Sequence, residues 1–120
     1  MFVPGGTIRP IDFAGLRIFD YTAGHDLTSS LAVIDVPPGT AHAEAWSKRS
    51  DKYYLVIDGT IRFMLDGAET DLVTGDFCLV PQGRRFSYSN PTATLARLVL
   101  VHTPNFNLAE EVFVETTSRT

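Results

Sequence analysis

Apolar and polar residues alternate along most of the chain, in short segments that end at glycine, proline or asparagine. A period of two residues is the pattern of a β-strand with one buried face, whereas amphipathic helices repeat every 3.6 residues. We expect strands in the segments 16–22, 30–36, 52–58, 60–65, 69–73, 77–81, 86–90 and 95–102. Turn residues recur at intervals of about 8–12 residues, which is typical of an all-β sandwich or barrel.

Turn and cap residues refine this pattern. Asp58-Gly59 separates two of the expected strands and predicts a tight hairpin, and Asp66-Gly67 marks a second turn. The one helical signal is Asn107–Phe113, where Asn107 is a candidate cap and Glu110 follows three residues later. This segment is either a short helix or an ordered tail.

The spacing of glycines and prolines is more specific than the strand pattern. Gly75, Pro81, Gly83 and Asn90 stand at the intervals G-x5-P-x-G-x6-N, and Gly39 and Gly59 bracket an earlier segment. In this skeleton the sequence resembles the cupin superfamily, over roughly residues 15–104. The resemblance implies an all-β fold, a single-domain cupin or jelly-roll antiparallel β-barrel. It implies one domain over residues 1–120, with a core at about 15–104 and terminal arms at a dimer interface.

The positions that hold metal ligands in this family are substituted here. By the resemblance, Lys52 stands in the carboxylate position and Phe86 in a histidine position, and the other two histidine positions hold no histidine either. An ammonium group repels a cation, and a phenyl ring cannot coordinate one. We therefore expect no standard metal site and no cofactor, with a non-standard divalent metal as the alternative.

Polar and aromatic side chains share faces of the expected strands. On an unbulged strand His42, Glu44 and Trp46 point to one side, and Lys52 and Tyr54 share a face of the next strand. Because side chains fill the interior of a small barrel, these faces predict a pocket. Its expected lining is His42, Glu44, Trp46, Lys52, Tyr54, Phe86, Tyr88 and His102. The strand parity around Trp46 stays open, since a slip of one residue turns a whole set outward.

Each pocket residue has a candidate role. His42 or His102 would be the general base, since an ordinary histidine pKa lies near neutrality, and Tyr54 or Tyr88 the acid. Lys52 would bind a carboxylate or polarise a carbonyl; the alternative is a structural ion pair with Glu44. Glu44, Trp46, Phe86 and Tyr88 would contact the ligand, or the aromatic members would simply belong to the core.

Three functions remain open. The first is a metal-independent isomerase, epimerase or cyclase that binds a small organic molecule. The second is a metal-dependent oxygenase or lyase with displaced ligands at His42, Glu44 and His102, or at His25. The third is a non-catalytic ligand-sensing or interaction module.

The composition of the chain limits the kinds of partner that the protein is expected to bind. Ten basic and fourteen acidic residues give a net charge of −4, and no basic run suggests nucleic-acid binding. The N-terminal residues lack the features of a signal peptide, and no apolar run is long enough for a membrane span, so we expect a cytoplasmic protein. Cys78 is the one cysteine, which excludes an internal disulfide and favours a buried, inert thiol.

Two surface features complete the expectations. Arg84 and Arg85 could rim the pocket, so an anionic ligand is a candidate. A homodimer would pair strand edges, with residues 1–6 and 113–117 as the candidate edge segments.

Overall fold

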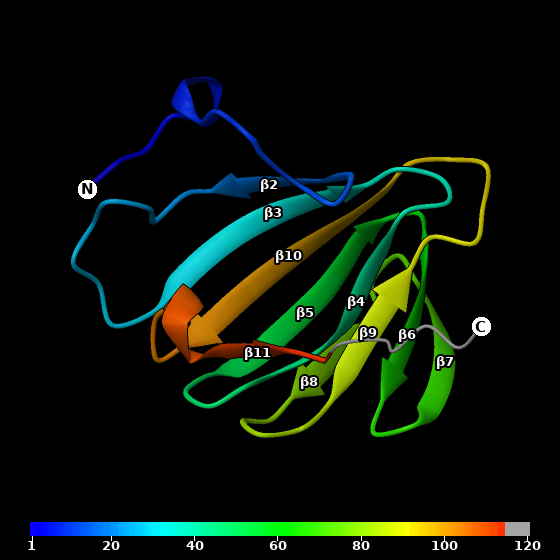
Figure 1. Ribbon diagram of the computed structural model, residues 1–120. Helices are drawn as coiled ribbons and strands as arrows, with labels where there is room; N and C mark the ends of the chain where they lie inside the picture. The colour runs from blue at the N-terminus through cyan, green and yellow to red at the C-terminus, as the bar shows by residue number, and fades with distance from the viewer. Residues whose placement is uncertain (115–120) are drawn as a thin grey trace.

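The computed structural model of the protein describes residues 1–114. Two antiparallel sheets face each other in a jelly-roll (Figure 1). The six-stranded sheet has the order β1 (Ile11–Phe13), β2 (Leu16–Asp20), β3 (Ser30–Val36), β10 (Ala96–Thr103), β5 (Asp51–Asp58) and β8 (Phe77–Val80). The five-stranded sheet has the order β11 (Glu111–Phe113), β4 (Ala41–Ser47), β9 (Phe86–Ser89), β6 (Thr60–Leu65) and β7 (Ala68–Val73). The expected all-β fold is confirmed, and each expected strand is present.

The two Asp-Gly turns have different roles. Asp66 and Gly67 both have positive φ, at 49° and 83°, and join the paired strands β6 and β7. This is the backbone of a type I′ hairpin. The prediction of a hairpin at Asp58-Gly59 is wrong, because β5 and β6 belong to different sheets. Gly59, at φ 80°, carries the chain from one sheet to the other.

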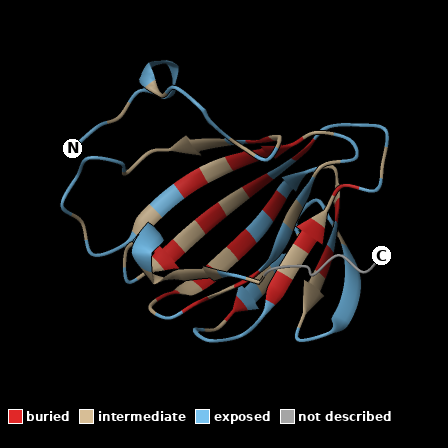
Figure 2. Ribbon diagram, viewed as in Figure 1, coloured by how far each residue is buried: buried red, intermediate tan, exposed pale blue. Residues whose placement is uncertain are grey.

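The core lies between the inner faces of the two sheets. Alternation along β3, β5 and β10 places about every second residue inside, which appears as buried stripes in Figure 2, although Asp35 on the outer side of β3 is buried as well. The buried cluster combines aliphatic residues with four aromatic residues: Tyr54, Phe63, Phe86 and Tyr88. These aromatic rings pack against one another, with centroid distances of 5.1–6.5 Å.

The outer face of the six-stranded sheet is unusually apolar. Register places Phe19, Val33, Val99, Leu55 and Phe77 side by side across five strands. A second row joins Leu31, Val101, Tyr53 and Leu79. Next to these rows runs a charged row of alternating sign: Arg17, Asp35, Arg97 and Asp58.

The two ends of the described chain differ from expectation. The helix expected at Asn107–Phe113 is limited to one 3₁₀ turn, η2 (Leu108–Glu110), which Asn107 caps by accepting a hydrogen bond from the Ala109 N–H. The chain then extends as β11 and pairs with β4. Residues 1–6 form no strand and hold only the start of a 3₁₀ turn, η1 (Gly5–Thr7). Of the second expected edge segment, residues 115–117 lie outside the described residues. Within residues 1–114, no helix has the length and apolar character needed to cross a membrane.

Candidate functional site

A cavity of about 260 Å³ opens at one end of the jelly-roll. At this end β11 pairs with β4, and residues of β11 and β5 both line the cavity. Its polar lining comes from His42, Lys52, Tyr54, Tyr88, His102 and Glu111, with Asp20 and Ser30. The rest is mostly apolar and includes Ile11, Phe13, Ile18, Ile34, Leu100, Phe106, Leu108 and Phe113. Convergent polar groups in an otherwise apolar hollow are the usual form of a small-molecule site.

A buried network of three polar side chains forms one wall of the cavity. The register of β5 against β10 places Lys52 directly opposite His102. The Lys52 ammonium donates to His102 Nε2 at 2.8 Å and to Glu111 Oε1 at 2.5 Å. The side chains of Lys52 and Glu111 are each 4% exposed, so this ion pair is shielded from solvent. The alternative ion pair of Lys52 with Glu44 is wrong.

Burial sets the protonation states of this wall. Burial, together with the adjacent Lys52 charge, lowers the pKa of His102 to about 3. His102 is therefore neutral at physiological pH, and because Nε2 accepts from Lys52, its proton lies on Nδ1. Burial also lowers the pKa of Lys52, whereas the Glu111 carboxylate raises it in part. The expectation that His102 could be a base does not fit these contacts, since its basic nitrogen is already occupied.

His42 also carries its proton on Nδ1, but no ammonium group occupies its other ring nitrogen. Its Nδ1 lies 2.6 Å from the carbonyl oxygen of Ala43, to which it donates. The ring packs between Phe13, Phe86, Tyr88 and Phe113, with centroid distances of 5.1–6.2 Å. Burial lowers the pKa of His42, so the imidazole is neutral near pH 7. The backbone bond fixes its tautomer and leaves Nε2 as the available proton acceptor on the ring.

The two tyrosines of the cavity are deeply buried. Tyr54 and Tyr88 are 2% and 3% exposed, and burial raises the pKa of both hydroxyls, so they stay protonated at neutral pH. Their rings pack edge to face at 5.7 Å. Both line the cavity, so their hydroxyl groups can donate to a ligand. Phe86 was expected in the pocket lining but does not border the cavity: it belongs to the buried core, with the Lys52 ammonium 5.4 Å from its ring centre.

A bulge in β4 separates the residues that an unbulged strand would keep together. The register against β9 shifts between His42 and Ala45, so Ala45 and Ser47 point into the core and Trp46 does not. Glu44 turns to the outer face, half exposed, and its carboxylate lies 3.8 Å from Arg85. The prediction that His42, Glu44 and Trp46 share one face is wrong, and neither Glu44 nor Trp46 lines the cavity.

The donor set does not fit a metal ion. The displaced-ligand hypothesis needs His42, Glu44 and His102 to converge, but Glu44 faces away from the other two. His25 lies on an exposed loop. Among residues 1–114 no group of three histidine, cysteine or acidic side chains could hold a metal ion. The family's carboxylate and histidine positions present an ammonium and a phenyl ring instead.

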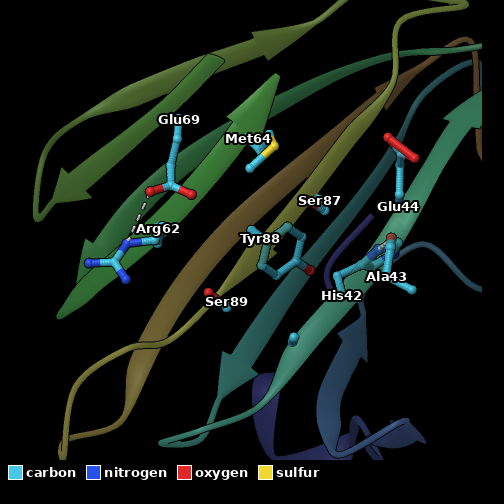
Figure 3. A pocket seen from close by; sticks show the side chains of 10 residues that line it. His42, Ala43, Glu44, Arg62, Met64, Glu69, Ser87, Tyr88 and Ser89 are labelled. Atoms are coloured by element: carbon cyan, nitrogen blue, oxygen red, sulfur yellow. Dashed lines mark hydrogen bonds and ion pairs between the residues drawn. The ribbon is translucent and has the colours of Figure 1, made fainter. Parts of the chain in front are cut away.

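A second, shallower hollow of about 290 Å³ lies on the outer face of β4, β9 and β6 (Figure 3). Arg62, Glu69 and Glu44 approach it from the surface, and Arg62 is paired with Glu69 and Asp71. His42 and Tyr88 border both hollows, because β4 and β9 form the wall between them. Its charged groups are solvated and paired with one another, so we place the functional site in the inner cavity.

Sequence reasoning missed Glu111. It lay in a segment interpreted as a helix or tail, and nothing local marks it as a site residue. The one signal was indirect: a lysine on the inner face of a barrel strand needs a carboxylate partner, and Glu44 was the nearest choice along the sequence.

The fold is that of a cupin, a jelly-roll with a cavity at one end. The cupin domain pattern matches residues 32–102, more than half of the chain, and the chain therefore belongs to the cupin family. A comparison with curated proteins gives no match.

Solved structures agree on the fold. A structure of Streptomyces Pac13, described as a nucleoside dehydratase, is 22% identical with a TM-score of 0.83, covering 98% of this chain and 93% of that one. A histidine-to-glutamine variant of the same protein with uridine has the same identity and TM-score, covering 98% and 92%. A cupin described as a sugar phosphate isomerase from Silicibacter pomeroyi is 17% identical, with a TM-score of 0.74 and coverages of 86% and 75%. At these identities the likeness concerns the fold alone.

Proposed function

We propose that the protein is a metal-independent enzyme that moves protons on a small organic molecule held in the inner cavity, as a lyase of the dehydratase type or an isomerase. The observation that carries this proposal is the orientation of His42. Its Nδ1 is held by the Ala43 carbonyl, and its neutral ring lines the cavity beside two protonated tyrosines. A fixed base next to fixed acids is the arrangement that general acid–base catalysis requires.

The chemistry follows from these groups. Nε2 of His42 accepts a proton from a carbon next to a carbonyl group of the substrate. In an elimination, the bond to a hydroxyl on the neighbouring carbon then breaks, and the departing oxygen takes a proton from Tyr54 or Tyr88 and leaves as water. In an isomerisation, the proton returns at another position. The nucleoside dehydratase and sugar phosphate isomerase activities of similarly folded proteins support this reaction class.

Binding and exchange measurements test the proposal. We expect uridine, used as a probe, to bind wild-type protein in titration calorimetry. We also expect carbonyl derivatives of nucleosides or pentoses in D₂O to lose water, or to exchange the proton next to the carbonyl, as followed by NMR. His42→Gln should retain the fold and lose at least 100-fold in exchange rate. His25→Gln, on an exposed loop, is the matched control. Equal rates in wild type and His42→Gln would refute the role of His42.

We propose further that the protein forms a homodimer through the outer face of the six-stranded sheet, not through strand edges. The two apolar rows include Phe77 at 56% exposed, and Leu55, Leu31 and Leu79 at 38–39%. Contiguous apolar surface that is left exposed marks an interaction site on a protein. The adjacent charged row supplies the polar rim that such interfaces have. A twofold axis through the face would set the apolar rows of one copy on those of another.

Mass measurement decides this proposal. Light scattering should give twice the chain mass of 13.2 kDa for wild type, and the single mass for Leu55→Lys and Phe77→Glu. Val73→Lys alters an exposed apolar residue of the other sheet and should leave the dimer intact. A monomeric wild-type protein at about 50 μM, or a dimeric Phe77→Glu variant, would exclude this interface.

A further inference from the structure

One oxygen of the buried network lacks a partner. Glu111 Oε1 accepts from Lys52, but Oε2 is buried and accepts no hydrogen bond from any group within residues 1–114. The Glu111 side chain is 4% exposed and borders the cavity. A charged oxygen without a donor is costly in a buried position, so this atom favours a ligand that brings a donor to it.

The neighbouring Lys52 has an unused hydrogen-bond donor. An ammonium group carries three N–H donors, and Lys52 uses one toward Glu111 and one toward His102. The third is unassigned among the described contacts. The same wall of the cavity therefore combines one free acceptor and one free donor, on two groups only 2.5 Å apart.

The charges of this pair restrict the ligand. A carboxylate or phosphate offers acceptors only and is repelled by Glu111. An ammonium group offers donors only and is repelled by Lys52. A hydroxyl can accept from Lys52 and donate to Glu111 at the same time. The arginines that suggested an anionic ligand do not border this cavity: Arg84 pairs with Asp66, and Arg85 lies near Glu44 on the outer face.

We propose that the Lys52–Glu111 pair recognises a hydroxyl group of an uncharged, polyhydroxylated ligand, a sugar or the sugar part of a nucleoside, and that Glu111 determines this specificity. The inference rests on the proposed function, because it names the substrate class of the same cavity.

The apolar side of the cavity favours a ligand that carries an aromatic ring in addition to its hydroxyl groups. Glu111 and Phe113 are two residues apart on β11 and both border the cavity, as expected for one face of a strand. The Phe113 ring lies 5.7 Å from that of Phe13, and Phe106 packs 5.0 Å from His102. Phe106 and Phe113 are about two-fifths exposed, so these rings lie at the entrance and can stack on a planar ring while the sugar reaches the polar wall.

Calorimetry with uridine, 2′-deoxyuridine and 3′-deoxyuridine tests the proposal. Wild type should bind uridine at least tenfold more tightly than one of the two deoxynucleosides, the one that lacks the recognised hydroxyl. Glu111→Gln should weaken uridine at least tenfold and abolish the preference, because the amide cannot supply the same charged acceptor pair. Glu110→Gln, the adjacent residue that does not border the cavity, should behave as wild type.

The outcomes separate this inference from the function on which it rests. Equal affinity of wild type for all three nucleosides, or unchanged uridine binding by Glu111→Gln, overturns the hydroxyl recognition and leaves the role of His42 standing. If wild type binds none of the three at 1 mM, both proposals fail for nucleosides. If Glu111→Gln does not fold, the comparison of nucleosides on wild type decides alone.

Discussion

Two histidines of the same cavity carry the proton on the same ring nitrogen, but only one has a free basic nitrogen, because their hydrogen-bond partners differ. His42 donates to a backbone carbonyl and keeps a free basic nitrogen, whereas His102 accepts from an ammonium group. Both are neutral near pH 7 because burial disfavours the charged imidazole. The sequence identified both as candidates but could not rank them, since the ranking depends on one backbone carbonyl and one lysine.

Burial of these histidines predicts acid sensitivity. The pKa of His102 is about 3 in the fold and near 6.5 in the unfolded chain, so the unfolded state binds more protons below pH 6.5. The free energy of unfolding should fall as the pH decreases from 6.5, by up to about 1.4 kcal/mol per pH unit for His102. The charged group in contact with His102 is Lys52, which is paired with Glu111. Urea unfolding between pH 7 and pH 4 measures the slope.

Substitutions test whether His102 causes this pH dependence of the free energy of unfolding. His102→Gln should show a shallower loss than wild type, whereas His25→Gln should follow the wild-type curve, because His25 is exposed. Identical slopes for the two variants would show that His102 is not held neutral by the fold.

At the scale of elements, irregular positions decide the site more than the regular strands do. The bulge in β4 turns Glu44 and Trp46 out and keeps His42 in. β11 brings Glu111 from the far end of the sequence against Lys52. Gly59 sends the chain from β5 in one sheet to β6 in the other, and so keeps β5 free to pair with β8 and β10.

The crossover at Gly59 is predicted to tolerate no side chain. A Cβ there would lie 2.9 Å from the Ala96 Cα and the Leu95 carbonyl oxygen, in addition to the strain of φ 80°. Gly59→Ala should destabilise the protein by at least about 2 kcal/mol. Gly67→Ala has a similar φ of 83° and open space, so it should cost only about 1 kcal/mol. Chemical unfolding compares them, and equal losses would mean that the contact with residues 95 and 96 is unimportant.

At the scale of the whole molecule, two sheets share one core. Residues from both sheets, such as Tyr54 and Leu98 on one and Phe63 and Phe86 on the other, belong to a single buried cluster. Neither sheet has a second apolar partner on its inner side. The binding cavity is the open end of that same core, so its walls depend on the integrity of both sheets.

This shared core predicts one cooperative unfolding transition. Trp46 lies on β4 opposite Val112, so its fluorescence reports the five-stranded sheet. Far-UV circular dichroism reports both sheets. The two signals should give the same urea midpoint, as two-state unfolding requires. Separate midpoints would show that one sheet can unfold without the other.

The sequence by itself determined the class of fold and the strands that carry the site. Alternation and turn residues are local properties, and the glycine–proline skeleton records where the backbone must reverse, so both can be recognised without a structure. It also identified His42, Lys52, Tyr54, Tyr88 and His102, which the structure brings to one cavity. Only the tertiary structure decided the direction of Glu44 and Trp46, the sheet to which β6 belongs, and the partner of Lys52. A bulge shifts strand parity by one residue, and a contact between residues 52 and 111 joins segments that no local pattern connects.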